Sequence, residues 1–314
     1  MYPTPPSVKT EVFFRVPDHL RRPGQLNAER RAAAKGGDKT DCFLEGPSFD
    51  LAGNLYLVDV AFSRIFRVDP AGNVEVLCEY NGEPNGLKIH RDGRIFVTDH
   101  KLGLLLLDPN KGSLSPVVER YMTESFKGLN DLFMTSKGDI YFTDQGQSSI
   151  DDPNGKVYRL NAAGRLERLL HNVPSPNGIV MSPDEKLLYV AATRGNCVWR
   201  SYLTPDGALA RTGIFVQMSG GTGPDGMAMD IEGNLMVAHV GAGIVWGFSA
   251  LGVPIMRIDS CEGLATTNMA YGGKDNQTLF ITESESGCVL IANLDVPGRP
   301  MHSFTTRAHF AMSA

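Results

Sequence analysis

The segment Gly138-Asp-Ile-Tyr-Phe-Thr-Asp144 is one copy of a pattern that recurs along the chain. Each copy has a turn rich in glycine, asparagine or acidic residues, followed by a short apolar strand that ends in a small or polar residue. Each copy has one large residue near its centre, and the six are Tyr56, Phe96, Tyr141, Tyr189, Met236 and Phe280. Successive members of this set are 40, 45, 48, 47 and 44 residues apart. A repeat of about 40 to 50 residues with several short strands is typical of β-propeller blades.

Each copy is followed by a second, alternating strand and then by a further apolar run, as at residues 157–164 and 166–170. Strands and turns at this spacing predict four antiparallel strands per unit. Six such units occupy about 270 residues and leave no room for a second domain. We therefore predict an all-β fold, a single six-bladed β-propeller over residues 1–314, in which residues 8–16 supply a strand that closes the ring.

One segment, residues 17–41, precedes the first blade and does not follow the repeat. It carries Arg21, Arg22, Arg30 and Arg31, and residues 26–35 have the composition of an amphipathic helix. Two interpretations stay open. The segment is either a solvated surface loop or a lid or homo-oligomer contact over the mouth, because insertions in repeat folds gather on one face.

The composition excludes several classes of protein. With 42% hydrophobic and 21% charged residues, the chain is neither disordered nor membrane-spanning, and it has no apolar run of ~18 residues. The formal net charge of −5 argues against a partner such as nucleic acid, whose phosphates attract basic surfaces. The first 16 residues lack the apolar core of a signal peptide, and the five cysteines are scattered without a Cys-x-x-Cys pair. We therefore predict a cytoplasmic protein with no membrane partner.

A polar position at a nearly constant distance before the large strand residue occurs in all six blades. Its members are two acids and four amides: Glu45, Asn85, Asn130, Asn177, Asp225 and Asn268. The distance is 11 residues for four of them and 12 for Asn177 and Asn268, whose blades have longer-looking turns. Equivalent positions of a radial repeat form a ring, so we expect six oxygen-bearing side chains to converge on the central channel. A Pro-Asn-Gly segment alone is also good β-turn sequence, but the recurrence favours a shared site.

These side chains are suited to a hard cation. They offer only oxygen atoms, which suits Ca²⁺ with its roughly six to eight oxygen ligands better than Zn²⁺. The two carboxylates balance one divalent charge, while the neutral amides add ligands. We therefore predict one central divalent cation, with Ca²⁺ first and Mg²⁺, Mn²⁺ or Zn²⁺ as alternatives.

The motifs around these positions carry a family resemblance. Glu45-Gly-Pro, Asn130-Asp-Leu, Ser175-Pro-Asn177-Gly and Gly223-Pro-Asp225-Gly, in this order, resemble the SMP-30/gluconolactonase/LRE-like family from about residue 42 to 295. The resemblance implies a six-bladed propeller with a central divalent ion, usually Ca²⁺, that hydrolyses lactones or related esters. The related diisopropylfluorophosphatase and paraoxonase groups share that metal site and act on phosphotriesters.

Carried over by position, Glu45, Asn177 and Asp225 match the family's core metal ligands, and Asn130 matches a further asparagine that contacts metal or substrate. Sugar-lactonase relatives often carry an arginine two positions before that asparagine. Here the position is Gly128, with Lys127 beside it. This departure argues against a plain aldonolactone as the substrate.

The resemblance and the oxygen ring together predict a metal-dependent hydrolase of a small lactone or ester. The cation would polarise the carbonyl, and Asp225 would act as general base or as nucleophile. We expect Asn130, Asn85 and Asn268 to contact substrate, and His239, like His100, could reach the channel from a strand end. Two alternatives stay open: a phosphotriesterase-like hydrolase on the same metal site, and a non-enzymatic calcium-binding propeller.

Three acids at strand ends have a simpler interpretation. Asp59, Asp99 and Asp144 each end one copy of the repeated strand. We predict that they cap backbone groups at the tops of their blades instead of taking part in the chemistry.

Overall fold

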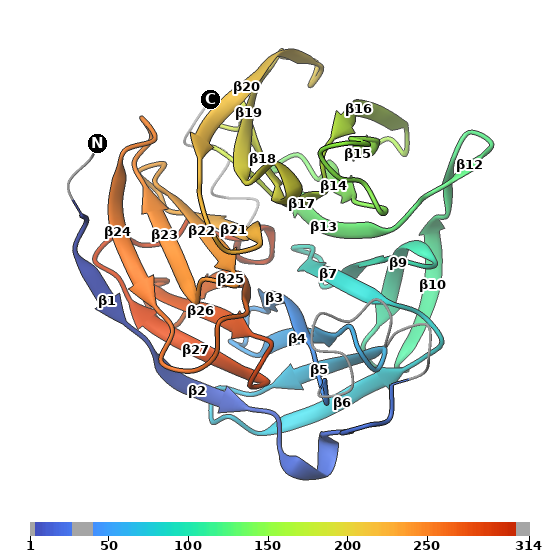
Figure 1. The fold of residues 1–314 in the computed structure, drawn as a ribbon. Coiled ribbons are helices and arrows are strands. Elements are labelled where there is room, and N and C mark those ends of the chain that lie inside the picture. Colours follow the sequence, from blue (N-terminus) through green and yellow to red (C-terminus); the bar gives the residue numbers. More distant parts are fainter. Residues whose placement is uncertain (1–3, 27–39, 306–314) are drawn as a thin grey trace.

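In the computed structural model, which describes residues 4–26 and 40–305, six sheets of four or five strands surround a central channel (Figure 1). The first strand of each blade lies innermost, and the next strands follow outward as an antiparallel meander. This arrangement confirms the predicted six-bladed β-propeller.

The first three blades follow the chain without interruption. Blade one is β3 (Leu44–Phe49), β4 (Leu55–Asp59), β5 (Arg64–Val68) and β6 (Val74–Glu79). Blade two is β7 (Pro84–Ile89), β8 (Ile95–Asp99), β9 (Gly103–Asp108) and β10 (Ser113–Val118). Blade three is β13 (Leu129–Met134), β14 (Ile140–Asp144), β15 (Gly155–Leu160) and β16 (Leu166–Val173), and the small hairpin of β11 (Arg120–Tyr121) and β12 (Glu124–Ser125) precedes it.

The last three blades continue the same order. Blade four is β17 (Pro176–Met181), β18 (Leu187–Ala192), β19 (Cys197–Leu203) and β20 (Leu209–Gln217). Blade five is β21 (Gly223–Met229), β22 (Leu235–Val240), β23 (Ile244–Phe248) and β24 (Pro254–Asp259). Blade six has β25 (Thr266–Gly272), β26 (Thr278–Glu283) and β27 (Cys288–Asn293) from the C-terminal part of the chain.

The N-terminal segment closes the ring, as predicted. β2 (Glu11–Arg15) pairs antiparallel with β27 as the outer strand of blade six, and the two lie side by side in Figure 1. β1 (Ser7–Lys9) pairs parallel with β24 and so adds a fifth strand to blade five. Thr10, between them, donates its backbone N–H to the Asp259 carbonyl at 3.1 Å. The predicted single strand is therefore two strands that join neighbouring blades.

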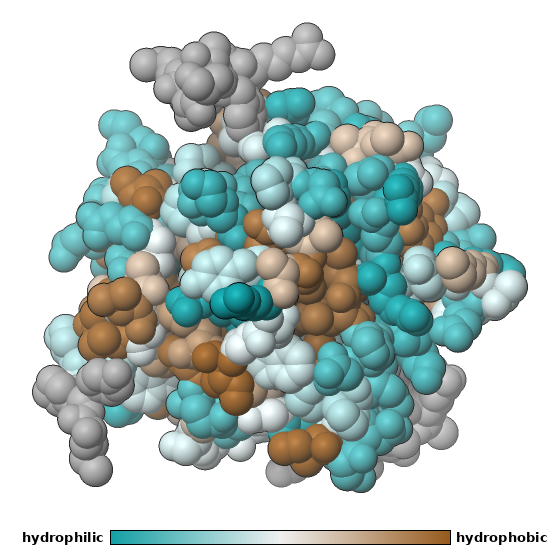
Figure 2. All heavy atoms as spheres, turned by 90° about the horizontal axis from the view of Figure 1, so that it is seen from above, coloured by the Kyte–Doolittle hydropathy of each residue, from teal (hydrophilic) through white to brown (hydrophobic). Residues whose placement is uncertain are grey.

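The hydrophobic core lies between the blades. The large repeat residues stand on the second strands, and Tyr56 packs with Leu87 and Ile89 of the next blade. Phe280 of blade six meets Phe49 of blade one with 4.8 Å between ring centroids, which completes the circle. Because second strands such as β4 are buried on both faces, they read as apolar runs in the sequence. Figure 2 views the ring edge-on and shows hydrophilic side chains over much of that side, with apolar patches between them.

Only the two ends of the 17–41 segment belong to the described residues. The first end forms the 3₁₀-helix η1 (Asp18–Leu20), and Arg21 binds Asp41 of the other end at 2.8 Å. Leu26 is buried against Ala61 and Phe62 of blade one. The helix expected at 26–35 lies outside the described residues except for Leu26, so the lid and loop interpretations stay predictions.

Candidate functional site

The inner strands are irregular at the same place in every blade. Each has a shift of register, or β-bulge, near its start, for example between Glu45 and Ser48 in blade one and between Pro224 and Met227 in blade five. A bulge redirects a side chain that would otherwise alternate with its neighbours. The predicted polar residues lie at these bulges, and this is how side chains of separate strands come to face one channel.

The pairing register corrects the predicted ring at one blade. Five large residues pair with an inner-strand residue that lies three positions after the polar one, as Tyr56 pairs with Ser48 and Met236 with Ala228. In blade six Phe280 pairs with Ala270, so the equivalent position is Thr267. The expectation that Asn268 shares this position is wrong, because the connection from β25 to β26 is longer than the counting assumed. Asn268 lies one residue deeper in the channel.

Threonines of the second strands hold these bulges in place. Thr98 accepts the Gly86 N–H at 2.9 Å and donates to the carbonyl of Asn130 in the next blade. Thr143 in the same way accepts the Asp131 N–H at 3.0 Å and donates to the Asn177 carbonyl at 2.8 Å. The signal for this network is present in the repeated Val-Thr-Asp and Phe-Thr-Asp strand ends. Blades two and three therefore each position the polar residue of the blade that follows.

A cavity of about 810 Å³, called here the mouth-side cavity, lies over these residues. Five of the predicted residues line it, and they are Glu45, Asn85, Asn130, Asn177 and Asp225. Glu45 and Asp225 are each only 4% exposed, so the two carboxylates lie at its buried end. Blade one contributes apolar side chains, while blades three and four contribute mainly amides and hydroxyls.

The buried end concentrates negative charge. Glu45 Oε2 accepts hydrogen bonds from the Asn268 amide at 2.9 Å and from the Gly46 N–H at 3.0 Å. Burial raises the pKa of Glu45 well above its ordinary value, and the nearby charges of Asp225 and Asp131 raise this pKa further. Without a cation, the folded protein therefore disfavours the ionised form of Glu45.

Asp131 belongs to this charged group although the counting did not select it. The residue is 2% exposed, and burial raises the pKa of its carboxyl group. Its Oδ2 lies 3.5 Å from the Asn268 amide nitrogen, so Asn268 lies between Asp131 and Glu45. Asp131 follows Asn130 directly in the Asn-Asp-Leu motif. The sequence prediction chose one polar residue per blade and therefore did not include Asp131.

The donor set fits a hard divalent cation. Within the described residues, Asn85 Oδ1 is buried and has no hydrogen-bond partner, which leaves an oxygen that a cation would satisfy. The described part of the chain has no group of three or more His, Cys, Asp or Glu side chains placed to bind a metal. The oxygens here come from carboxylates and amides together, and bound positive charge would offset the repulsion around Glu45.

His239 and Asn268 do not line the mouth-side cavity. His239 is 3% exposed; its Nε2–H donates to the Gly220 carbonyl at 2.9 Å, and its Nδ1 accepts from Trp246 at 3.3 Å. Burial lowers the pKa of this imidazole. Both nitrogens are thus used by blade five and the loop that leads into it. Asn268 is turned toward Glu45 and Asp131.

Gln145, a strand-end residue that the sequence indicated could line the pocket, does line the mouth-side cavity. Asn130 donates its amide to Gln145 Oε1 at 3.3 Å, and Gln145 donates to the Ser175 hydroxyl at 2.9 Å. Ser175 has a positive φ of 58°, an uncommon conformation for a residue other than glycine. This chain of hydrogen bonds links blades three and four along one wall and fixes the orientation of the Asn130 amide.

The strand-end acids have the predicted capping role. Asp99 accepts the backbone N–H groups of Glu83, Lys101 and Leu102 at 2.7–2.9 Å. Asp59 accepts the Phe43 N–H at 2.9 Å, and Asp144 accepts the Lys127 N–H at the same distance. The loops that surround the cavity are therefore tied to the ends of the second strands.

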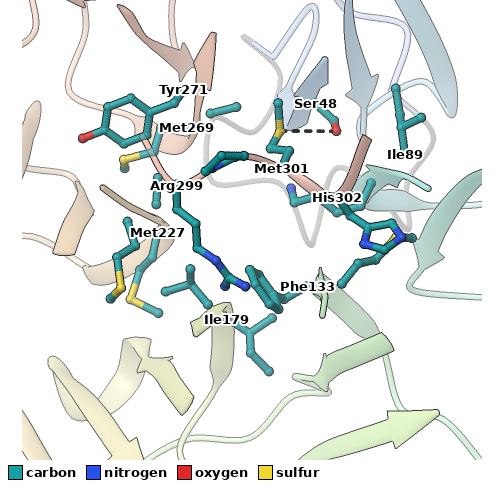
Figure 3. A pocket seen from close by; sticks show the side chains of 17 residues that line it. Ser48, Ile89, Phe133, Ile179, Met227, Met269, Tyr271, Arg299, Met301 and His302 are labelled. Carbon is teal, nitrogen blue, oxygen red and sulfur yellow. Dashed lines mark hydrogen bonds between the residues drawn. The ribbon is translucent and has the colours of Figure 1, made fainter. Parts of the chain in front are cut away.

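The opposite end of the channel is narrow. A pocket of about 70 Å³, called here the closed-end pocket, lies there among methionine, aromatic and aliphatic side chains (Figure 3). Residues 299–304 run across it, and the Arg299 guanidinium lies 4.8 Å from the centre of the Phe133 ring. The Ser303 hydroxyl donates to the Phe49 carbonyl at 2.8 Å. The C-terminal segment thus covers this end.

The fold and the site together define a class of protein, the six-bladed propellers with buried carboxylate and amide side chains at one end of the channel. The chain belongs to the SMP-30/gluconolactonase/LRE-like family, whose model matches residues 43–285. This confirms the predicted family.

Relatives and solved structures agree with this assignment. The chain is 34% identical over 267 residues to lactonase drp35 from Staphylococcus aureus, covering 79% of this chain and 81% of the relative. It is 33% identical over 270 residues to lactonase drp35 from Staphylococcus epidermidis, with 79% and 82% covered. A gluconolactonase from Xanthomonas campestris is similar, with a TM-score of 0.71, 26% identity and coverage of 88% and 95%. Regucalcin, a calcium-binding protein from Agrobacterium tumefaciens, shares the fold with a TM-score of 0.77 at 22% identity, covering 96% and 99%.

Among the described residues, no helix has the length and apolar character needed to cross a membrane.

Proposed function

We propose that this protein is a metal-dependent hydrolase that opens the ring of a small lactone in the mouth-side cavity. The observation that carries the proposal is the pair of buried carboxylates, Glu45 and Asp225, beside the amides of Asn130 and Asn177 at the end of a cavity large enough for a small substrate. Relatives that align over most of the chain are named lactonase. The chemistry of the site and the names of the relatives support the same activity.

Glu45, Asn177 and Asp225 would hold the cation, with Asn130 as a further ligand or as a contact to substrate. Ca²⁺ is the first candidate because the donors are oxygen atoms of mixed charge. When bound, the cation supplies Lewis acidity toward a carbonyl oxygen. Its positive charge would also keep the buried carboxylates ionised.

Asp225 is the residue that would act on the reacting atoms. As a general base, its carboxylate takes a proton from water while the water oxygen bonds to the acyl carbon. As a nucleophile, it forms an acyl-enzyme that water then hydrolyses. In both routes the ring C–O bond breaks and the product is a hydroxy acid. Asn130, held by Gln145, and Asn85 would orient the substrate.

Asn268 and His239 were also expected to contact substrate. Their hydrogen bonds support other roles: Asn268 positions Glu45, and His239 joins Gly220 to Trp246. We therefore propose Asn268 as a positioning residue and His239 as a structural one.

The test is a panel of lactones and organophosphates assayed with the purified protein, with chelator, and after return of Ca²⁺, Mg²⁺, Mn²⁺ or Zn²⁺. We expect lactone turnover that the chelator removes and a divalent ion restores. Asp225→Asn should fold like the wild type and lose about a thousand-fold or more of kcat/KM, whereas Asp206→Asn, an exposed turn residue, should not change it. Preferred turnover of organophosphates would favour the phosphotriesterase-like alternative. Metal binding without turnover, or full activity in Asp225→Asn, would overturn the proposal.

A further inference from the structure

His100 is a residue of the mouth-side cavity to which the proposed function gives no role. It follows the end of β8, lines the cavity and donates its backbone N–H to the Glu83 carbonyl at 2.8 Å. Among the cavity residues that the structure describes, it is the one imidazole. An imidazole, which can both donate and accept a proton, therefore lines the space where substrate would bind.

The position of the His100 ring depends on a glycine in the neighbouring blade. A Cβ atom built on Gly128 would overlap the ring atoms of His100, so a side chain at position 128 would displace the imidazole. Gly128 also has a positive φ of 147°. Gly128 lies two residues before Asn130 in the chain. Its close contact with the imidazole therefore places His100 near the carboxylates and amides of the mouth-side cavity.

A buried carboxylate interacts electrostatically with the imidazole. Asp144 is 1% exposed; its Oδ1 accepts the Lys127 N–H at 2.9 Å, while Oδ2 is buried without a hydrogen-bond partner in the described part of the molecule. Its charge interacts with His100 and with Lys156, and Lys156 also lies 3.4 Å from Glu124. The imidazole thus lines the cavity and lies within electrostatic reach of this buried carboxylate. A nearby negative charge stabilises the protonated form of a histidine.

We propose that His100 is the general acid of the lactonase reaction, with Asp144 as its positioning residue. The proposal rests on the proposed function. As water adds to the acyl carbon, its proton passes to Asp225. The ring C–O bond then breaks, the electron pair stays on the ring oxygen, and this oxygen takes the proton of the protonated imidazole. Neutral His100 regains a proton from solvent or from Asp225, so lactone and water yield the hydroxy acid.

The dependence on the leaving group distinguishes this role from a structural one. In an aryl lactone the ring oxygen leaves as a phenol, whose pKa is about 10, and needs little protonation. In an aliphatic lactone it leaves as an alkoxide that is far more basic and requires a proton as the bond breaks. Loss of a general acid typically lowers the rate by about 10²-fold or more. This decrease should affect the aliphatic lactones.

The experiment measures kcat/KM of wild type and His100→Gln for an aryl lactone, dihydrocoumarin, and an aliphatic one, δ-valerolactone, in the presence of Ca²⁺. We expect a loss of about 100-fold for the aliphatic lactone and less than about threefold for the aryl lactone. Asp144→Asn should show a smaller loss with the same preference. Gly128→Ala should resemble His100→Gln because it displaces the ring. His171→Gln, an exposed histidine of β16, is the matched control and should change neither substrate.

Two results would overturn the assignment of His100. Equal losses for both lactones would indicate a substrate contact or a structural role, and no loss for either would remove the residue from the reaction. Thermal unfolding of each variant identifies any variant that is merely unfolded. If His100→Gln does not fold, Asp144→Asn tests the proposal independently. If the wild type hydrolysed no lactone of the panel with any of the four divalent ions, the proposed function itself would be wrong, and this proposal would fall with it.

Discussion

The two ends of the central channel are built from the same six inner strands, yet they differ in volume and in the polarity of their lining. The mouth-side cavity measures about 810 Å³ and is lined by carboxylates, amides and hydroxyls, with apolar side chains from blade one. The closed-end pocket measures about 70 Å³ and is lined largely by apolar side chains. The first lies where the strands begin and bulge, and the second lies farther along, where their pairing is regular. Position along a strand thus separates the proposed chemistry from the packing that supports it.

The boundary between the two ends lies at one position of each inner strand, directly after the residue at the bulge. Four of the six inner strands have glycine at this level: Gly46, Gly86, Gly178 and Gly226. A Cβ on Gly178 would overlap the Asp225 carbonyl, and a Cβ on Gly226 would overlap the Asn268 side chain. The other two strands carry Asp131 and Asn268 there. Glycine lets the strands approach closely, and the two polar residues join the buried acids to the rest of the channel.

The largest expected effect comes from removing charge at this boundary. Glu45→Gln should abolish the stabilisation that Ca²⁺ gives to the wild type, which is about 4 kcal/mol at a thousand-fold excess over Kd. With chelator, the variant should be at least as stable as the wild type, because a neutral amide needs no desolvation of charge and does not repel Asp225. Urea unfolding with Ca²⁺ and with chelator measures both effects.

Glu232→Gln, on an exposed turn, is the control and should keep the full response to Ca²⁺. An unchanged response in Glu45→Gln would place the cation elsewhere.

A smaller effect is expected at the closed end, and it should appear in stability alone. Arg299 forms an ion pair with Glu185 and donates to the Met181 carbonyl at 3.2 Å. Glu185 also accepts the Ser136 N–H at 2.7 Å, so these contacts join two blades to the C-terminal segment. Arg299→Met leaves a largely buried carboxylate without its cation, which costs about 3 kcal/mol. Urea unfolding measures this loss, and kcat/KM for the lactone should stay within about twofold because no reacting group lies at this end.

Glu185→Gln combined with Arg299→Met should recover part of the lost stability, since no unpaired charge remains. A loss of lactone turnover as large as that of Asp225→Asn would show that the two ends are not separate.

The sequence was sufficient for the blades and for most of the polar residues, because both depend on spacing within one blade. The 11-residue distance identifies Glu45, Asn85, Asn130 and Asp225, which all line the mouth-side cavity. Blade six shows the limit of this counting. The stretch between Asn268 and Phe280 includes a turn. Its length becomes clear only from the pairing of Ala270 with Phe280.

Contacts between blades were beyond prediction, since no spacing within a blade encodes them. Asp131 and Asn268 are 137 positions apart and meet across the channel. In the sequence, Gly128 was notable only because related sugar lactonases often have an arginine at this position. In the structure, the absence of a side chain at Gly128 leaves space for the His100 ring. A contact within blade five was also missed: His239 accepts a hydrogen bond from Trp246 on the neighbouring strand and does not line the mouth-side cavity.

The smallest expected effect is a pH dependence at the closed end. Burial, followed by the nearby His90 and Arg91, lowers the pKa of His302 from 6.5 to about 4. Because this pKa is depressed, the folded state resists protonation: the contribution of His302 to stability is complete above pH 6.5 and is lost as the pH falls toward 4. The slope is at most about 1.4 kcal/mol per pH unit, so the wild type should lose about 1 kcal/mol relative to His302→Leu between pH 7 and 5.5. Urea unfolding of both proteins at these pH values measures the difference, with the exposed His171→Leu as control. A difference that did not change with pH would mean that His302 is already protonated or solvated in the folded protein, and that the C-terminal segment does not seal this end of the channel.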